Sequence, residues 1–378
     1  MKVFKINEIK NKKIIGRNVK NVEELPEINL FWAASALKIN VKACEVWAGF
    51  ASDYDSNEPW VSVFLNGRRI SRFMVEKGEE KSVCLVRGLN PQTENEICIY
   101  KDTQPMPGDT KHSLKITKIS LDDNGEFCEV KPADIKIEFI GDSITSGEGL
   151  AGAPEQMEWI PAVFVGSESY AANVARHFNA DFSVFSQCGW GLCWGWDGNR
   201  NNNMPSYYEK VCGVMEGEFH NQLGENQDYD FKEGSDFVVL NLGTNDNGAF
   251  FQPSWKNPKT GIEYKLSLEN GKISATDKDF IVQAAKNFLS LIRKHNQNAQ
   301  IIWCYGMIEL NLIPECIKTA VNQWKKETGD NNIHVLELDP MEKVEKNDED
   351  KGSRGHPGKK VHKLAADKLE KLIEKLRK

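Results

Sequence analysis

The chain has 378 residues, of which 40% are hydrophobic and 27% are charged, and its formal net charge is −7. This composition is typical of a globular protein with a packed core, and the length favours two domains over one. No apolar run approaches the roughly 18 residues needed to cross a bilayer, which excludes a membrane-spanning protein. The dispersed Lys and Arg residues argue against nucleic acid as a partner.

The N-terminus and the cysteines bear on the cellular compartment. Residues 1–8 are polar and lack the apolar middle region of a secretory signal. The nine cysteines include no CxxC pair and no metal-ligand spacing. We therefore expect reduced thiols, no bound metal or cofactor, and a cytoplasmic location. The sequence leaves the oligomeric state open.

Up to about residue 130, apolar residues recur with a period of two. The alternation over 37–43 is typical of a strand with one solvent-facing side. Asn66-Gly67 follows the apolar run 61–65 and is a strong hairpin signal, because both residues tolerate positive φ. Further strands are expected at 81–86, 96–100 and 114–121. Short strands separated by turn residues predict an all-β, jelly-roll-like sandwich domain over residues 1–133.

From about residue 134 the pattern changes to short apolar runs separated by helical stretches. The five runs are typical of buried parallel strands and lie at 135–140, 181–186, 237–242, 301–305 and 333–338. An amphipathic helix is expected over 277–295, with Thr276 and Asp279 as its capping box, and another over 361–376. We predict an α/β domain over residues 134–378, with a five-stranded parallel sheet in the flavodoxin-like order 2-1-3-4-5.

Three of these strands end in residues suited to acyl transfer. Ser143 follows the first strand on a glycine-flanked turn before a helix, which suits a nucleophile. Gly189 follows the second strand, where a backbone N–H can approach a bound group. Asn245 follows the third, where its amide can face a developing oxyanion. Taken singly, each has an ordinary alternative: a helix cap, a tight turn or loop chemistry.

His356 is the histidine best placed to act as a base. It lies between Gly355 and Pro357 on a loop before the last helix, whereas the other six histidines have no motif around them. The order 2-1-3-4-5 would bring the first three strand ends to one rim of the sheet. A nucleophile, oxyanion donors and a histidine base there are the minimum set for acyl transfer.

The four segments together resemble a known family. GDSI, CGWG, GTND and GHP look like the four consensus blocks of the SGNH, or GDSL-type, hydrolases. The resemblance implies that Ser143 is the nucleophile and His356 the base. It also implies an oxyanion hole formed by the N–H groups of Ser143 and Gly189 and the amide of Asn245. With its preceding β-domain, the chain resembles carbohydrate esterase family two, which implies removal of acetyl groups from sugars.

One position departs from the family pattern. Most SGNH hydrolases carry Asp three residues before the histidine, and here that residue is Ser353. An imidazole needs an acceptor at its far nitrogen to fix its tautomer. The resemblance to family-two esterases, which use a Ser-His dyad, implies that a backbone carbonyl holds the ring here. The alternative is that Asp350 or Glu349 folds back into the role.

Aromatic residues beside these loops indicate how a sugar could bind. Trp190, Trp194 and Trp196 lie next to the Gly189 loop, and Trp255 follows the Asn245 loop, so their rings could stack on a sugar face. The alternative is that they anchor loops in the core. Trp190, Trp194 and Trp255 are assigned to substrate binding, as is Asp142 next to the serine. We expect an acetylated oligosaccharide as substrate. The alternatives are a thioesterase or lysophospholipase acting on another acyl ester, or a non-catalytic carbohydrate-binding protein.

Overall fold

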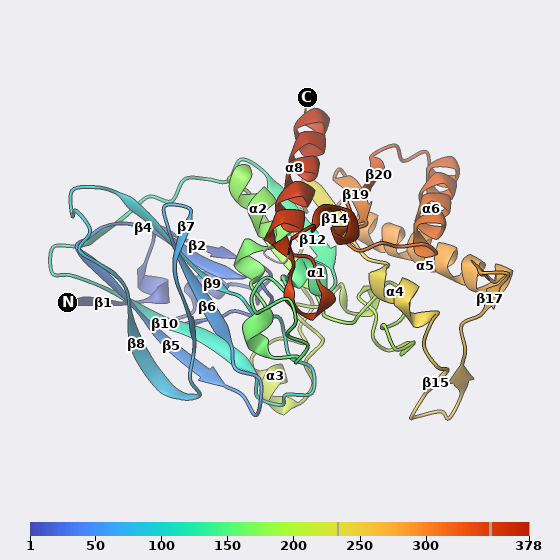
Figure 1. Ribbon diagram of the computed structural model, residues 1–378. Helices are drawn as coiled ribbons and strands as arrows, with labels where there is room; N and C mark the ends of the chain where they lie inside the picture. The colour runs from blue at the N-terminus through green and yellow to red at the C-terminus, as the bar shows by residue number, and fades with distance from the viewer. Residues whose placement is uncertain (233, 348–349, 378) are drawn as a thin grey trace.

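The structure is a computed structural model that describes residues 1–232, 234–347 and 350–377. A β-sandwich is followed by a parallel sheet with helices on both faces (Figure 1). The predicted boundary between residues 133 and 134 falls in the segment that joins the last sandwich strand to the first parallel strand. None of the described helices is long and apolar enough to cross a membrane.

The sandwich consists of two antiparallel sheets. One has the order β1-β10-β5-β8 with β3 beside β10, and the other has the order β11-β4-β9-β6-β7 with β2 beside β4. The strands are β1 (Lys2–Lys5), β2 (Lys12–Ile15), β3 (Ile28–Asn29), β4 (Ala36–Lys42), β5 (Glu45–Asp53), β6 (Trp60–Leu65), β7 (Arg68–Met74), β8 (Gly78–Arg87), β9 (Asn95–Lys101), β10 (Ser113–Leu121) and β11 (Glu126–Cys128).

Alternating side chains of both sheets form the sandwich core. Leu37 and Ile39 of β4 belong to the same buried cluster as Val46 and Phe50 of β5 in the other sheet. The expected hairpin is confirmed: β6 and β7 pair antiparallel around Asn66 (φ 50°) and Gly67 (φ 76°). Because both turn residues lie in the left-handed region, the strands are joined by the shortest kind of hairpin connection.

The five expected parallel strands form one sheet in the predicted order, β13-β12-β14-β19-β20. All neighbours pair in parallel. The strand bounds are Lys136–Gly141 for β12, Asp181–Ser186 for β13, Phe237–Asn241 for β14, Gln300–Tyr305 for β19 and Ile333–Glu337 for β20. Because their carboxyl ends meet at one edge, the segments after β12, β13 and β14 are brought together there.

Helices cover both faces of the parallel sheet. α5 and α6 pack on one face, in a cluster with Leu240 and Trp303, and α2 and α8 pack on the other, with Phe139 and Val239. The helices are α1 (Ser143–Ser146), α2 (Tyr170–His177), α3 (Glu218–Gln222), α4 (Thr244–Ala249), α5 (Ala275–His295), α6 (Ile313–Thr328), α7 (Met341–Val344) and α8 (Lys359–Leu376). Two small hairpins precede α5, formed by β15 (Trp255–Lys256) with β16 (Glu263–Tyr264) and by β17 (Leu268–Glu269) with β18 (Lys272–Ile273).

The predicted capping box of α5 is wrong. The helix begins two residues earlier than expected, and its N-cap is Ser274, whose Oγ accepts a hydrogen bond from the Asp277 N–H at 3.2 Å. Asp277 in turn accepts from the Ser274 hydroxyl at 2.9 Å. Thr276 lies inside the first turn of the helix and does not cap it. Ser274 directly follows strand β18, so the hairpin ends where the helix begins.

A buried arginine joins the sandwich to the parallel sheet. Arg17, which follows β2, is fully buried, and its Nη2 lies 2.7 Å from Oε1 of Glu138 on β12. Its Nη1 donates to the carbonyl oxygens of Tyr208 and Lys210 at 2.6 and 3.0 Å. The guanidinium also lies over several aromatic rings, including that of Phe185 at 4.3 Å from the centroid. These contacts tie the N-terminal segment to the middle of the catalytic sheet.

A second buried contact lies nearer the carboxyl edge of the sheet. Asp102, just after β9, is fully buried and accepts hydrogen bonds from Arg72 Nε at 2.9 Å and Ser62 Oγ at 2.6 Å. It also accepts from the N–H of Ser167, which precedes α2. The segment after β9 is therefore fixed against the parallel-sheet domain.

We predict that Arg17→Ala lowers the free energy of unfolding by roughly 3–5 kcal/mol, because Glu138 stays buried without its partner. Urea unfolding followed by tryptophan fluorescence measures this change. The control is Arg87→Ala, which removes an exposed ion pair with Glu45 and leaves stability close to that of the wild type. A loss in Arg17→Ala no larger than in the control would contradict the prediction.

Candidate active site

Ser143 lies at the start of a short helix at the carboxyl edge of the sheet. β12 ends at Gly141, Asp142 is the N-cap of α1, and its carboxylate accepts from the Ile144 N–H at 3.0 Å. Ser143 is the first helical residue, so its own N–H has no acceptor within the helix. The residue is 7% exposed, and it lines a cleft.

His356 meets this serine from the far end of the chain. Its Nε2 lies 2.9 Å from Ser143 Oγ, although the two residues are 213 positions apart. The loop packs closely enough that a Cβ at Gly149 (φ 83°) would lie 2.6 Å from the Cβ of His356. Glycine is therefore required at position 149 by both backbone conformation and space.

The other ring nitrogen of His356 is held by a backbone carbonyl. Nδ1 lies 3.0 Å from the carbonyl oxygen of Arg354, and that residue adopts a left-handed conformation (φ 58°, ψ 26°). Asp350, one of the two carboxylates considered for this role, is paired instead with Lys360 at 2.7 Å. Glu349, the other, lies outside the described residues.

The loops that carry Gly189 and Asn245 lie beside the serine. Gly189 has φ 76°, and its N–H has no acceptor among the described residues. Asn245 is the second residue of α4, and its Nδ2 donates to the carbonyl oxygen of Trp190 at 2.8 Å and lies 3.4 Å from Oδ2 of Asp142. One amide of Asn245 thus links the ends of three neighbouring strands.

Asp246 fixes these loops, although no sequence pattern singled it out. It is fully buried and accepts hydrogen bonds from the N–H groups of Leu192 and Cys193 at 2.8 and 2.7 Å. Burial raises its pKa to about 6, and these backbone hydrogen bonds act in the opposite direction. Its position directly after Asn245, in GTND, was the available signal. Burial likewise raises the pKa of Asp142 to about 7.

Ser143, Gly189, Asn245 and His356 line one cleft of about 560 Å³. The sandwich domain contributes to the same cleft through the segment after β9, where Gln104 accepts a hydrogen bond from the Cys188 N–H at 2.7 Å. The remaining lining residues are Met106, Pro107, Glu148, Trp159, Gln187, Cys188, Trp190, Trp196, Asn202 and Arg354.

Of the four predicted substrate-binding residues, only Trp190 lines the cleft. Trp194 is buried in the core and stacks on the ring of Phe280, an exposed residue of α5. Trp255 lies on β15 and stacks against Tyr264, and it does not line the cleft. Asp142 is fully buried beneath the serine. The tryptophans that line the cleft beside Trp190 are Trp159 and Trp196, 38% and 55% exposed.

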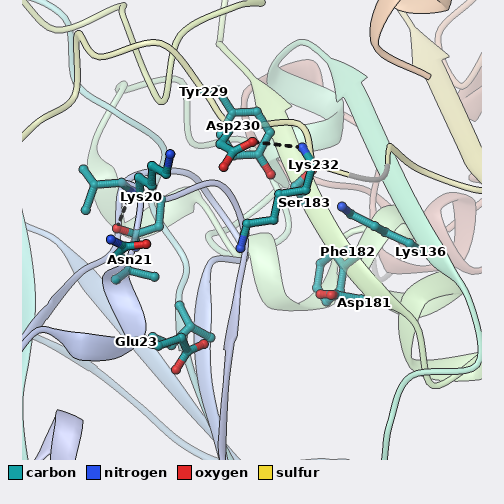
Figure 2. A pocket seen from close by; sticks show the side chains of 15 residues that line it. Lys20, Asn21, Glu23, Lys136, Asp181, Phe182, Ser183, Tyr229, Asp230 and Lys232 are labelled. Atoms are coloured by element: carbon teal, nitrogen blue, oxygen red, sulfur yellow. Dashed lines mark hydrogen bonds between the residues drawn. The ribbon is translucent and has the colours of Figure 1, made fainter. Parts of the chain in front are cut away.

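A second groove lies at the opposite, amino edge of the parallel sheet. Lys136 and Asp181, which begin β12 and β13, line it together with residues that follow β2. Figure 2 shows lysines of both domains around it beside Asp181 and Asp230. It contains none of the predicted site residues. Over residues 1–232, 234–347 and 350–377, no group of three or more His, Cys, Asp or Glu side chains could hold a metal ion.

Comparison with known proteins agrees with this geometry. The model of the GDSL-like lipase/acylhydrolase family matches residues 139–364. The acetyl xylan esterase Est2A of the rumen bacterium Butyrivibrio proteoclasticus is a solved structure with a TM-score of 0.93 and 37% identity, over 100% of this chain and 99% of that one. A family-two carbohydrate esterase from Clostridium thermocellum, solved with cellohexaose, has a TM-score of 0.76 and 22% identity, over 97% of this chain and 99% of that one.

Among curated proteins, the chain is 25% identical over 347 residues to the cellulase/esterase CelE of Acetivibrio thermocellus. The match covers 89% of this chain and 36% of that protein, so the chain spans about a third of the length of this relative. These similarities confirm the expected fold class and a carboxylic-ester hydrolase. The chain belongs to the GDSL-like lipase/acylhydrolase family and has the two-domain fold of the family-two carbohydrate esterases.

Proposed function

We propose that this enzyme removes O-acetyl groups from a carbohydrate through an acetyl-enzyme formed on Ser143. The observation that carries the proposal is the 2.9 Å contact between Ser143 Oγ and His356 Nε2 in a cleft open to solvent. The similarity to an acetyl xylan esterase over the whole chain supports an acetyl ester as the reacting group.

The Ser-His pair is oriented for proton transfer. With Nδ1–H donating to the Arg354 carbonyl, the lone pair of Nε2 faces the Ser143 hydroxyl. His356 then removes the serine proton as Oγ attacks the acetyl carbonyl carbon. The C–O bond to the sugar breaks when the tetrahedral intermediate collapses, and the imidazolium returns its proton to the sugar oxygen. In the second half, His356 takes a proton from water as the water oxygen attacks the acetyl carbon. Collapse of this second intermediate breaks the bond from the acetyl carbon to Ser143 Oγ, the imidazolium returns its proton to Oγ, and the acetyl group leaves as the acid.

The oxyanion has three donors available in this proposal. The Ser143 N–H lies at the N-terminus of α1, and the Gly189 N–H lacks an acceptor among the described residues. The Asn245 Nδ2 donates one hydrogen to the Trp190 carbonyl, and in this proposal the other turns from its long 3.4 Å contact with Asp142 to the oxyanion. Donors fixed before the reaction stabilise charge without reorganising during it. Asp246 supports this role by holding the 192–193 segment to the helix that carries Asn245.

The cleft lining favours an acetylated oligosaccharide over a long-chain acyl ester. Trp159 and Trp196 present partly exposed rings at the cleft, and such rings can stack on the apolar face of a sugar. Gln104, Gln187 and Asn202 add side-chain amides that can hydrogen-bond to sugar hydroxyls. A thioesterase or lysophospholipase would require an apolar lining for its acyl chain.

We also propose that the enzyme works in the cytoplasm. All nine cysteines are free thiols, and five of them are buried. Free thiols persist in reducing compartments, whereas disulfides are common in secreted proteins.

We predict that Ser143→Ala and His356→Ala abolish acetate release from acetylated oligosaccharides, because nucleophile and base are lost. Initial rates on acetyl, butyryl and octanoyl esters test the reaction and the acyl preference together, and we expect acetyl to be fastest. His177→Ala, at a half-exposed histidine of α2, is the control with normal activity. Normal turnover by Ser143→Ala, or its labelling by a fluorophosphonate at the wild-type rate, would overturn the proposed function.

We predict that Asn245→Ala lowers kcat by about 10²–10³-fold with little change in KM, because an oxyanion donor acts mainly in the transition state. Steady-state kinetics on an acetylated sugar measure both constants. Asn201→Ala, at an exposed residue, is the matched control. A rise in KM with unchanged kcat would assign Asn245 to ground-state binding instead.

We predict that Asp350→Asn leaves kcat within about threefold of the wild type, because Asp350 pairs with Lys360 and the Arg354 carbonyl already holds the ring. The same acetate-release assay provides the measurement, with His356→Ala as the reference for full loss. If Asp350→Asn lost as much activity as that reference, a carboxylate would complete a triad after all.

A further inference from the structure

A buried carboxylate lies beside the base of the proposed reaction without a role in it. Glu148 is fully buried although it lines the cleft. Its Oε1 accepts from Arg354 Nε at 2.8 Å, and its Oε2 accepts no hydrogen bond from the described residues. Oε2 lies 3.7 Å from Nε2 of His356, the nitrogen that faces the serine. A buried carboxylate oxygen without a donor is costly and calls for a compensating interaction.

We propose that Glu148 is a positioning residue that both orients His356 and stabilises its protonated form during the reaction. This inference rests on the proposed function, because it assumes that His356 takes the Ser143 proton. In most SGNH hydrolases an Asp at Nδ1 stabilises the protonated histidine, and that Asp is missing here. The inference assigns this stabilisation to Glu148, which lies five positions after Ser143 and near Nε2 instead of Nδ1.

The orienting part acts through Arg354. Its guanidinium is fixed by Glu148 and by the carbonyl oxygen of Met157. These anchors hold a non-glycine residue in the left-handed region, a strained conformation that persists only when its surroundings enforce it. In this conformation the Arg354 carbonyl reaches Nδ1 of His356. The side chain and the carbonyl of one residue thus connect Glu148 to the ring.

The electrostatic part follows from proton transfer. When the O–H bond of Ser143 breaks, a new N–H bond forms at Nε2 and the ring becomes positively charged. A carboxylate oxygen 3.7 Å away then attracts that charge, and burial of Glu148 keeps solvent from screening the attraction. The proton passes from the ring to the sugar oxygen in the first half-reaction and to Ser143 Oγ in the second, so the carboxylate is unchanged at the end of each.

The other groups near the ring do not supply this charge. His362 of α8 is buried, which lowers its pKa to about 3, so it stays neutral. Burial raises the pKa of the Cys188 thiol, and Glu148 raises it further, so the thiol is neutral too. Asp142 lies under the serine with a pKa near 7. Arg354 carries a positive charge that opposes protonation of the ring, which leaves Glu148 as the carboxylate in contact with it.

The test is Glu148→Gln, which keeps an acceptor for Arg354 and removes the charge. We expect kcat/KM on an acetylated sugar to fall about tenfold, KM to stay within threefold, and the acid limb of the kcat/KM profile to move down by about one pH unit. Glu158→Gln makes the same change at an exposed residue near the cleft and should leave the profile in place. An acid limb that stays at its wild-type position in Glu148→Gln would overturn the inference.

The double variant Glu148→Gln/Arg354→Gln guards against misfolding of the single one, because it replaces the ion pair with two neutral amides. Its acid limb should lie between those of Glu148→Gln and the wild type, and a limb at or above the wild-type position would overturn the inference. Ser143→Ala separates this inference from the proposed function. Loss of activity there with unchanged Glu148 variants removes only the inference, whereas an active Ser143→Ala removes both.

Discussion

The proposed chemistry depends on one contact, between the serine hydroxyl after β12 and the imidazole on the loop before α8. The two residues meet because β12 is an internal strand of a parallel sheet whose strands all end at one edge. The loop before α8 returns to that edge from the end of the chain, and α8 packs against α2 on one face of the sheet. The order of the strands therefore determines which loops meet at the site, independently of the side chains that line the cleft.

The sandwich domain contributes residues to the cleft. The buried ion pair of Arg17 with Glu138 fixes it to the parallel sheet at one place, and the hydrogen bond from the Ser167 N–H to Asp102 fixes it at a second. The ion pair tolerates little displacement, because separating its partners would leave a charge buried and unpaired. The segment after β9 is therefore held against the loop after β13, where the side chain of Gln104 binds the backbone of Cys188. One wall of the cleft is thus set by the packing between the domains.

Local sequence patterns predicted the fold better than they predicted the cleft. The five parallel strands, their order and the Asn66-Gly67 hairpin follow from periodicity and turn chemistry, which act over a few residues. Ser143, Gly189 and Asn245 could be proposed as site residues because each follows a strand end, and His356 because it lies between Gly and Pro on a loop before the last helix. Trp194 and Trp255 could not be placed in the same way, because whether an aromatic ring faces a core or a cleft depends on packing between distant segments.

Glu148 and Trp159 were missed for the same reason. Neither residue ends a strand or belongs to a repeating pattern, and each reaches the cleft only because the segment after α1 folds against the loop that carries His356. That folding is visible in the hydrogen bond from the Ser353 N–H to the Gly149 carbonyl, which joins positions 204 residues apart by number. A sequence motif could have suggested Glu148 through GDSITSGEG, but only three-dimensional structure relates it to the imidazole.

The same fold explains why serine occupies the position where most relatives of this type carry aspartate. Ser353 is fully buried, and its hydroxyl donates to the Ala151 carbonyl at 2.7 Å. A carboxylate has no hydrogen to donate, so aspartate there would bury its charge against another acceptor. It would also add a second negative charge close to the segment that holds Glu148. The observed arrangement avoids both costs. The neutral Arg354 carbonyl orients the ring at Nδ1. The carboxylate near Nε2 is that of Glu148, whose buried charge is already paired with the Arg354 guanidinium.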